Sequence, residues 1–365
     1  MRIVRRMNTS LLFLTIALFG GGLLILFSAS MVLSYKNFGS IWSYALRQFL
    51  IGGIIGAVLC TVGALVPYRQ WKRLAIPLML TSFFLLALLF IPHTSYSFGG
   101  ARRWLKLGPV SFQPSEFLKF SFIVYLASWL DARRRQVASI SQGMIPFALM
   151  ITVVAVFLIM QPDVGTLGII LATAGMMYLV GGGKISQIAA LAGLGLVLFY
   201  FIIQLAPYRL SRVLVFFKPD LDPQGAGYQI SQASIAIGTG GFWGAGFGRG
   251  VQKYHYLPEP MGDSIFAIFV EEMGFLGALI LTGAFAAFFI KGFAIARNAP
   301  DTFGRLLASG ISVGIMTQAF VNMAAISGLL PLTGIPLPFL SYGGTALGMT
   351  LGMVGILLNI SKRYT

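Results

Sequence analysis

The sequence is poor in charged residues, cysteine and histidine. Only 10% of its 365 residues are charged, against roughly one quarter in soluble domains. Its one cysteine, Cys60, cannot form an internal disulfide, and its two histidines, His93 and His255, are too far apart in sequence to suggest a Cys/His metal site. These shortages exclude a disulfide-stapled domain and a zinc-binding domain.

The sequence is instead rich in long apolar runs. A hydrocarbon core about 30 Å thick needs roughly 20 apolar residues per helix, and hydrophobic residues make up 57% of the chain. Ten runs of suitable length occur, at about 11–35, 45–66, 74–92, 117–131, 143–160, 165–182, 185–205, 264–290, 306–328 and 342–360. We therefore predict an all-α polytopic membrane protein, with residues 1–365 forming a single ten-helix domain. The first run is too long for a signal-peptide core and lacks a small-residue cleavage site, so it is expected to remain as a helix.

Acidic residues are much scarcer than basic ones, with 10 against 26. If both termini lie in the cytoplasm, fifteen of the basic residues fall in cytoplasmic segments, as the positive-inside rule requires. Ten others fall on the outer face of the cytoplasmic membrane, and Lys119 lies at the start of a helix. That outer group exceeds what orientation needs, which indicates an anionic ligand on the outer face rather than a nucleic acid.

Two long outer segments, at about 92–116 and 206–263, are expected to be irregular and functional. The glycine-rich stretch 238–250 lacks the GK[ST] ending of a phosphate-binding loop and follows no strand. It is therefore expected to be a packed or flexible outer loop, with Arg249 and Lys253 near its end placed to contact an anion. The stretch PLTGIPLPF at 331–339 cannot form a regular helix and must be an outer loop or a buried re-entrant segment.

Ionisable residues inside apolar runs are functional candidates because they are costly in a membrane. Glu116 and Lys119 lie three residues apart on a helix expected to begin at Pro114 or Ser115, so they share one face. They either anchor that helix as an ion pair or line a polar cavity. Glu271 and Glu272 lie about 12 Å deeper than Asp263 along a helix. One of these two is expected to face the interior and pair with a basic group, in a structural role.

Asp263 lies at the start of an apolar run and at the outer membrane boundary. The helix dipole stabilises a negative charge at this position. Asp is also a preferred N-cap residue, so Asp263 is either a helix cap or an ionised functional carboxylate.

Several separated motifs resemble one family, the SEDS proteins (shape, elongation, division and sporulation). The motifs are GARRWL at 100–105, GPVSFQPSEFLK at 108–119, QPDVGT at 161–166, DPQGAGYQ at 222–229, YLPEP and DSIFA within 256–267, and PLTGIPLPFLSYGG at 331–344. SEDS proteins are ten-helix membrane glycosyltransferases that polymerise the peptidoglycan precursor lipid II. The residues in these motifs are more similar to those of the division branch (FtsW-like) than to those of the elongation branch (RodA-like), which is the alternative.

The resemblance implies roles for individual residues. Asp263 matches the essential aspartate proposed as general base, Glu116 and Lys119 match the polar pair of the outer cavity, and Arg102 and Arg103 match basic positions beside it. Together with Arg212, the cations Lys119, Arg102 and Arg103 are the candidates for stabilising a leaving pyrophosphate. Where the family usually has His-Thr or a similar polar pair before the aspartate, this chain has Met261-Gly262, so any hydrogen bond from that pair is lost.

The expected activity is inverting glycosyl transfer between lipid II units at the outer face, with polyprenyl pyrophosphate as leaving group. No cofactor is expected on protein ligands, although Mg²⁺ or Mn²⁺ bound mainly to the pyrophosphate is an option. The resemblance also implies a class B penicillin-binding protein and other division proteins as partners. The alternatives are a lipid II flippase and a non-catalytic division scaffold.

Overall fold

Helices occupy all ten of the apolar runs, and among the described residues six helical spans are long and apolar enough to cross a membrane. The computed structural model describes residues 7–91, 94–98, 101–107, 110–204 and 214–362. Within these ranges the spans are α1 (Thr9–Phe38), α2 with η1 and α3 (Ser43–Arg47, Gln48–Gly53, Ile54–Leu65), α5 (Ala75–Leu88), α6 (Pro114–Ala132), η2 with α7 (Ile140–Met144, Ile145–Met160), α8 (Val164–Val180), α9 (Ile185–Gln204), α12 (Ile265–Arg297), α13 (Thr302–Ile326) and α14 (Gly344–Ser361). A short helix, α4 (Tyr68–Arg73), links the second span to the third. The predicted all-α polytopic membrane fold is confirmed.

The helices divide into an inner and an outer group. In α13 and α14, 78% of the most apolar stretch is buried inside the protein, against 28% in α1 and 22% in α12. The outer helices expose large apolar side chains such as Phe13, Leu24 and Ile76. Because water would not tolerate so much exposed apolar surface, this perimeter is the lipid-facing surface.

Small residues bring α3 and α14 into close contact. A Cβ atom added to Gly355 would lie 2.1 Å from the carbonyl oxygen of Cys60, and one added to Gly63 would lie 2.7 Å from that of Gly352. Close backbone approach through glycine is the usual way in which membrane helices associate, since lipid offers no hydrophobic drive between them.

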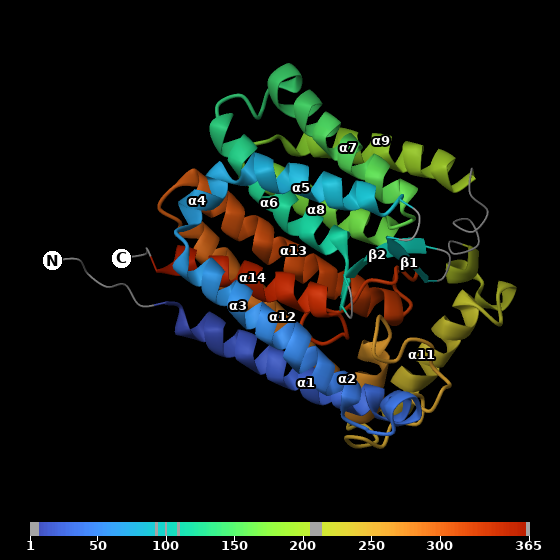
Figure 1. Cartoon of the computed structure of the whole chain (residues 1–365). Helices are drawn as coiled ribbons and strands as arrows, with labels where there is room; N and C mark the ends of the chain where they lie inside the picture. The colour runs from blue at the N-terminus through green and yellow to red at the C-terminus, as the bar shows by residue number, and fades with distance from the viewer. Residues whose placement is uncertain (1–6, 92–93, 99–100, 108–109, 205–213, 363–365) are drawn as a thin grey trace.

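The two long outer segments are more regular than the sequence suggested, and the expectation of irregular loops was wrong. The strands β1 (Ser95–Phe98), β2 (Ala101–Leu107) and β3 (Val110–Phe112) form an antiparallel sheet. The second segment contains a 3₁₀ turn, η3 (Pro219–Leu221), and the helix α11 (Ala226–Gly240). Figure 1 shows the sheet and α11 at one end of the bundle and both chain termini at the other.

Helix α12 is broken at Gly274, whose φ of 68° and ψ of −169° lie outside helical values. The glycine-rich loop after α11 supplies the hydrogen bonds that the break removes. The N–H groups of Ala245 and Gly246 donate to the carbonyls of Glu271 and Glu272 at 2.9 and 3.0 Å. The N–H of Phe275 donates in turn to the carbonyl of Gly241 at 2.9 Å. Residues 241–250 are therefore a loop fixed by backbone hydrogen bonds, and residues 238–240 form the last turn of α11.

The carboxylates of Glu271 and Glu272 hold the same loop. Glu271 accepts from the N–H of Val251 at 2.7 Å, and Glu272 accepts from the N–H of Gly248 at 3.0 Å. Glu272 also pairs with the ammonium of Lys253 at 2.7 Å and accepts from the Ser28 hydroxyl of α1 at 2.7 Å. The prediction that one glutamate pairs with a basic group is confirmed. Lys253, however, was wrongly counted as an outer cation facing an anion, because its side chain is fully buried in this pair.

We expect Gly274→Ala to destabilise the protein. An alanine is strained at this φ and ψ, at a cost of about 1–3 kcal/mol. Its Cβ would also lie 2.3 Å from the backbone nitrogen of Gly244. Thermal unfolding of the purified protein in one detergent measures the effect. Gly21→Ala in α1 is the control, since nothing lies within 4 Å of a Cβ there and alanine favours helix. Equal unfolding temperatures for both variants would contradict the expectation.

Candidate active site

Asp263 lies just outside α12 and does not occupy its N-cap position, which belongs to Ser264. Asp263 is half-buried. The side-chain amide of Gln229, on α11, donates to Asp263 Oδ1 at 3.4 Å and to the hydroxyl of Ser264 at 2.9 Å. Of the two interpretations of Asp263, the geometry favours a side chain directed into a site over a helix cap.

The loop that carries Asp263 is held through its backbone carbonyls. The N–H of Tyr342 donates to Met261 O at 2.8 Å, and the hydroxyl of Ser341 donates to Gly262 O at 2.7 Å. The side-chain amide of Asn322 donates to Asp263 O at 2.8 Å. None of these bonds uses a side chain at 261 or 262, so the loop is fixed without the polar pair that the family usually has there.

Two amide side chains on α13 connect this loop to the proline-containing segment. Asn322 donates to the carbonyl of Ile335 at 2.7 Å as well as to Asp263 O, and Gln318 donates to the carbonyl of Pro336 at 2.9 Å. Residues 335 and 337–341 are buried. Residues 335–339 therefore follow the second of the two predicted options, non-helical backbone largely buried in protein, where side chains must satisfy its polar groups. Residues 331–333 are half-buried and Gly334 is exposed.

Glu116 and Lys119 form the predicted ion pair on α6, which begins at Pro114 as expected. Their charged atoms are 2.8 Å apart, and the Lys119 ammonium also donates to Gln318 Oε1 at 2.5 Å. Only 3% of the Glu116 side chain and 7% of the Lys119 side chain are exposed. The pair is thus enclosed, and it connects to the Asp263 loop through the amides of α13.

A cavity of about 20 Å³ lies beside Lys119, between Thr173 and Gln318. This is room for one water molecule. The Thr173 hydroxyl is buried without a hydrogen-bond partner, so a water there would have two polar neighbours in Thr173 and Lys119.

Arg103, on strand β2, extends to the turn between α7 and α8 and to Gly334. Its guanidinium donates to the carbonyl of Pro162, in the turn between α7 and α8. A Cβ atom added to Gly334 would lie 4.0 Å from both Arg103 Nη1 and Asp263 Oδ2. Arg103 Nε and Asp163 Oδ2 are buried and have no hydrogen-bond partner. The guanidinium of Arg103 and the carboxylate of Asp263 therefore both lie near Gly334.

The side chains of two predicted site residues, Arg102 and Arg212, lie outside the described part of the structure. The backbone of Arg102 pairs with Ser97 in the sheet. Conversely, the sequence analysis did not single out Gln229, Gln318, Asn322 or Asp163. Gln318 and Asn322 carry a detectable signal, because amides spaced i, i+4 inside an apolar helix need interior partners.

Comparison with known proteins supports a single family. The family model for FtsW, RodA and SpoVE, described as "Cell cycle protein", matches residues 9–365. The chain belongs to this family. A probable peptidoglycan glycosyltransferase FtsW from Trichlorobacter lovleyi is 40% identical over 354 residues, covering 96% of this chain and 92% of that protein. Stage V sporulation protein E from Bacillus subtilis is 40% identical over 353 residues, covering 96% of each.

Solved structures agree with the sequence relatives. A chain from a peptidoglycan synthase complex that coordinates polymerization and crosslinking superposes with a TM-score of 0.79 at 29% identity, covering 97% of both chains. The rod shape determining protein RodA from Thermus thermophilus gives a TM-score of 0.72 at 28% identity, covering 98% of both chains. The recognition as a SEDS protein is confirmed, and the 40% identity to an FtsW makes it FtsW-like.

We expect Lys119→Met to be more destabilising than the double substitution Glu116→Leu/Lys119→Met. Removing one partner of a buried ion pair leaves the other charge unpaired, at about 3–5 kcal/mol, whereas apolar replacement of both is often nearly neutral. Thermal unfolding of the single and double variants tests this ordering. Lys72→Met is the control, because Lys72 pairs with Asp131 at 2.5 Å on the exposed surface. If the double variant is no more stable than Lys119→Met, the pair is not the enclosed unit described above.

Proposed function

We propose that this membrane protein is a peptidoglycan glycosyltransferase that polymerises lipid II in septal cell-wall synthesis. The family match and the FtsW relatives support the reaction class. The observation that carries the proposal is the placement of Asp263 Oδ2 and Arg103 Nη1 near Gly334. A carboxylate beside a cation suits a reaction in which one group loses a proton and another leaves as an anion.

In the proposed reaction, Asp263 is the general base. The 4-hydroxyl oxygen of the acceptor sugar attacks the anomeric carbon of the donor and forms the new glycosidic bond. Its proton passes to the Asp263 carboxylate during the attack, because a sugar hydroxyl is too weak an acid to ionise beforehand. The bond from the anomeric carbon to the polyprenyl pyrophosphate breaks, and attack from the opposite face inverts that carbon.

The leaving pyrophosphate needs positive charge rather than a proton. Arg103 is the leading candidate, since it is half-buried and shares the neighbourhood of Gly334 with Asp263. Arg102 and Arg212 remain candidates from the sequence. The enclosed amine of Lys119 is bound to Glu116 and Gln318, so we assign Lys119 to holding the site rather than to direct contact.

A divalent cation would have to take most of its ligands from the substrate. Among the described residues, no group of three or more His, Cys, Asp or Glu side chains is arranged to hold a metal. Asp263 is the carboxylate placed to add a protein ligand. Bound Mg²⁺ or Mn²⁺ would neutralise pyrophosphate charge, which is the chemistry that Arg103 also provides.

We further propose that the end of the bundle bearing Asp263 faces outward and that both termini are cytoplasmic. The two termini lie together at the opposite end (Figure 1), and the basic loops of the sequence fall on their side. A class B penicillin-binding protein and other division proteins are the proposed partners. The similarity to a chain from a peptidoglycan synthase complex supports an assembly of this kind.

The flippase and scaffold alternatives lose support from the same geometry. A flippase needs polar groups spread across the membrane, and Glu271 and Glu272 were the candidates away from the outer boundary. Both carboxylates are occupied by the glycine-rich loop and Lys253. A scaffold that only docks proteins has no need of a carboxylate and a guanidinium beside Gly334.

We expect Asp263→Asn to reduce glycan polymerisation from purified lipid II by about 100-fold or more, the usual contribution of a general base. The protein is assayed alone and with its penicillin-binding protein, and its unfolding temperature is compared with wild type. Glu259→Gln is the companion variant, because Glu259 is the other carboxylate in this loop. Polymer formation by Asp263→Asn at the wild-type rate would exclude the base assignment, and loss only in Glu259→Gln would move it to Glu259.

We expect Asn322→Asp to lower kcat about tenfold or more with little change in KM, because it removes the donor that positions Asp263 without touching substrate. A new carboxylate would also face the carbonyls of Asp263 and Ile335. Polymerisation rates over a range of lipid II concentrations separate kcat from KM. Asn298→Asp, at the exposed end of α12, is the control. Unchanged kcat in a folded Asn322→Asp protein would rule out this positioning role.

A further inference from the structure

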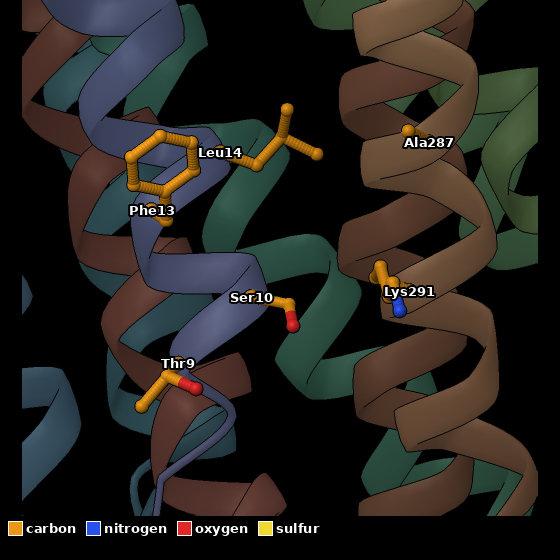
Figure 2. A pocket seen from close by; sticks show the side chains of 6 residues that line it. All are labelled: Thr9, Ser10, Phe13, Leu14, Ala287 and Lys291. Atoms are coloured by element: carbon orange, nitrogen blue, oxygen red, sulfur yellow. The ribbon is translucent and has the colours of Figure 1, made fainter.

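A groove of about 430 Å³ opens between the first turns of α1 and the last part of α12. It is lined by Thr9, Ser10, Phe13, Leu14, Ala287 and Lys291. Figure 2 shows Ser10 and Leu14 on α1 and Lys291 and Ala287 on α12 on either side of it. The two helices bond to each other further from the termini, where Ser28 meets Glu272. The groove thus lies at the end of the bundle opposite the proposed active site.

One end of the groove is rich in hydrogen-bond donors. Lys291 is exposed and has no carboxylate within 4.0 Å among the described residues, whereas Arg69 and Lys72 at the same end are paired with Asp301 and Asp131. The first turn of α1 adds the backbone N–H groups and hydroxyls of Thr9 and Ser10. Asn8 caps the N–H of Leu11, so the two preceding N–H groups have no partner within the helix. A helix N-terminus and an ammonium both favour an anion.

The other end of the groove is apolar. Phe13, Leu14 and Ala287 continue it toward the middle of the bundle, and 74% of Phe13 is exposed at the lipid-facing perimeter. A free phosphate ion would use the donors and leave this wall uncovered. A phospholipid would use both ends, since its phosphate lies at the membrane surface and its acyl chains lie deeper.

We propose that this groove binds an anionic glycerophospholipid from the leaflet on the side of the termini. The phosphate of the lipid accepts from Lys291 and from the first turn of α1, and an acyl chain lies along Phe13, Leu14 and Ala287. Because α1 also donates from Ser28 to Glu272, a lipid that bridges α1 and α12 stabilises the contact between the two helices. The site is independent of the proposed glycosyl transfer.

The test is lipid binding to the purified full-length protein, measured by native mass spectrometry during titration with phosphatidylglycerol or phosphatidylcholine. We expect phosphatidylglycerol to bind more tightly and to raise the unfolding temperature. Lys291→Ala should weaken its binding about fivefold, the effect of one lysine near an anionic lipid surface. The matched control is Arg297→Ala, which removes an exposed cation from the same helix outside the groove.

A second variant tests the shape of the site without changing charge. Ser10→Trp fills the groove from an exposed position on α1, and we expect it to reduce phosphatidylglycerol binding while the protein remains folded. Equal binding by wild type, Lys291→Ala and Ser10→Trp would overturn the proposal. So would equal affinity for phosphatidylcholine, or the same rise in unfolding temperature with inorganic phosphate alone, which would indicate a site for free anions.

Discussion

The break in α12 at Gly274 is the constraint on which the rest of this structure depends. Inside a membrane, a broken helix leaves carbonyl and N–H groups that water cannot satisfy. The glycine-rich loop supplies partners for them, and the carboxylates of Glu271 and Glu272 hold that loop through its own N–H groups. The loop in turn leads into residues 254–263, so the contacts that close the break also fix the chain that runs to the proposed catalytic aspartate.

The proposed site is assembled mainly from segments that are neither helix nor strand. Asp263, Pro162 and Gly334 all lie in such segments, which converge on Arg103. Helix α13 holds the segments that contain Asp263 and Gly334 through the side-chain amides of Gln318 and Asn322. Irregular backbone can bring several carbonyls and side chains to one point, and the surrounding bundle gives that point the rigidity that catalysis needs.

The positions of the helices were predictable from the sequence, because hydropathy measures the same requirement that the membrane imposes. The Glu116–Lys119 pair and the non-helical backbone of the proline-containing segment were predictable for similar local reasons. The sheet, helix α11 and the burial of Lys253 were not predictable from the sequence. A lysine next to a glycine-rich loop looks exposed in sequence, and only the fold shows that Glu272 meets it. The amides of Gln318 and Asn322 were detectable as polar residues inside an apolar helix, but the partners of Asn322 were not, because they are backbone carbonyls, which every residue has.

A hydrogen bond to a backbone carbonyl does not depend on which side chain the accepting residue carries. Tyr342, Ser341 and Asn322 donate hydrogen bonds to the backbone carbonyls of residues 261–263, and every residue type has such a carbonyl. Selection on geometry therefore falls on the residues that donate, while the accepting positions are free to drift. Met261-Gly262 can therefore precede the aspartate without loss of these bonds, because only the backbone carbonyls of the two residues are used.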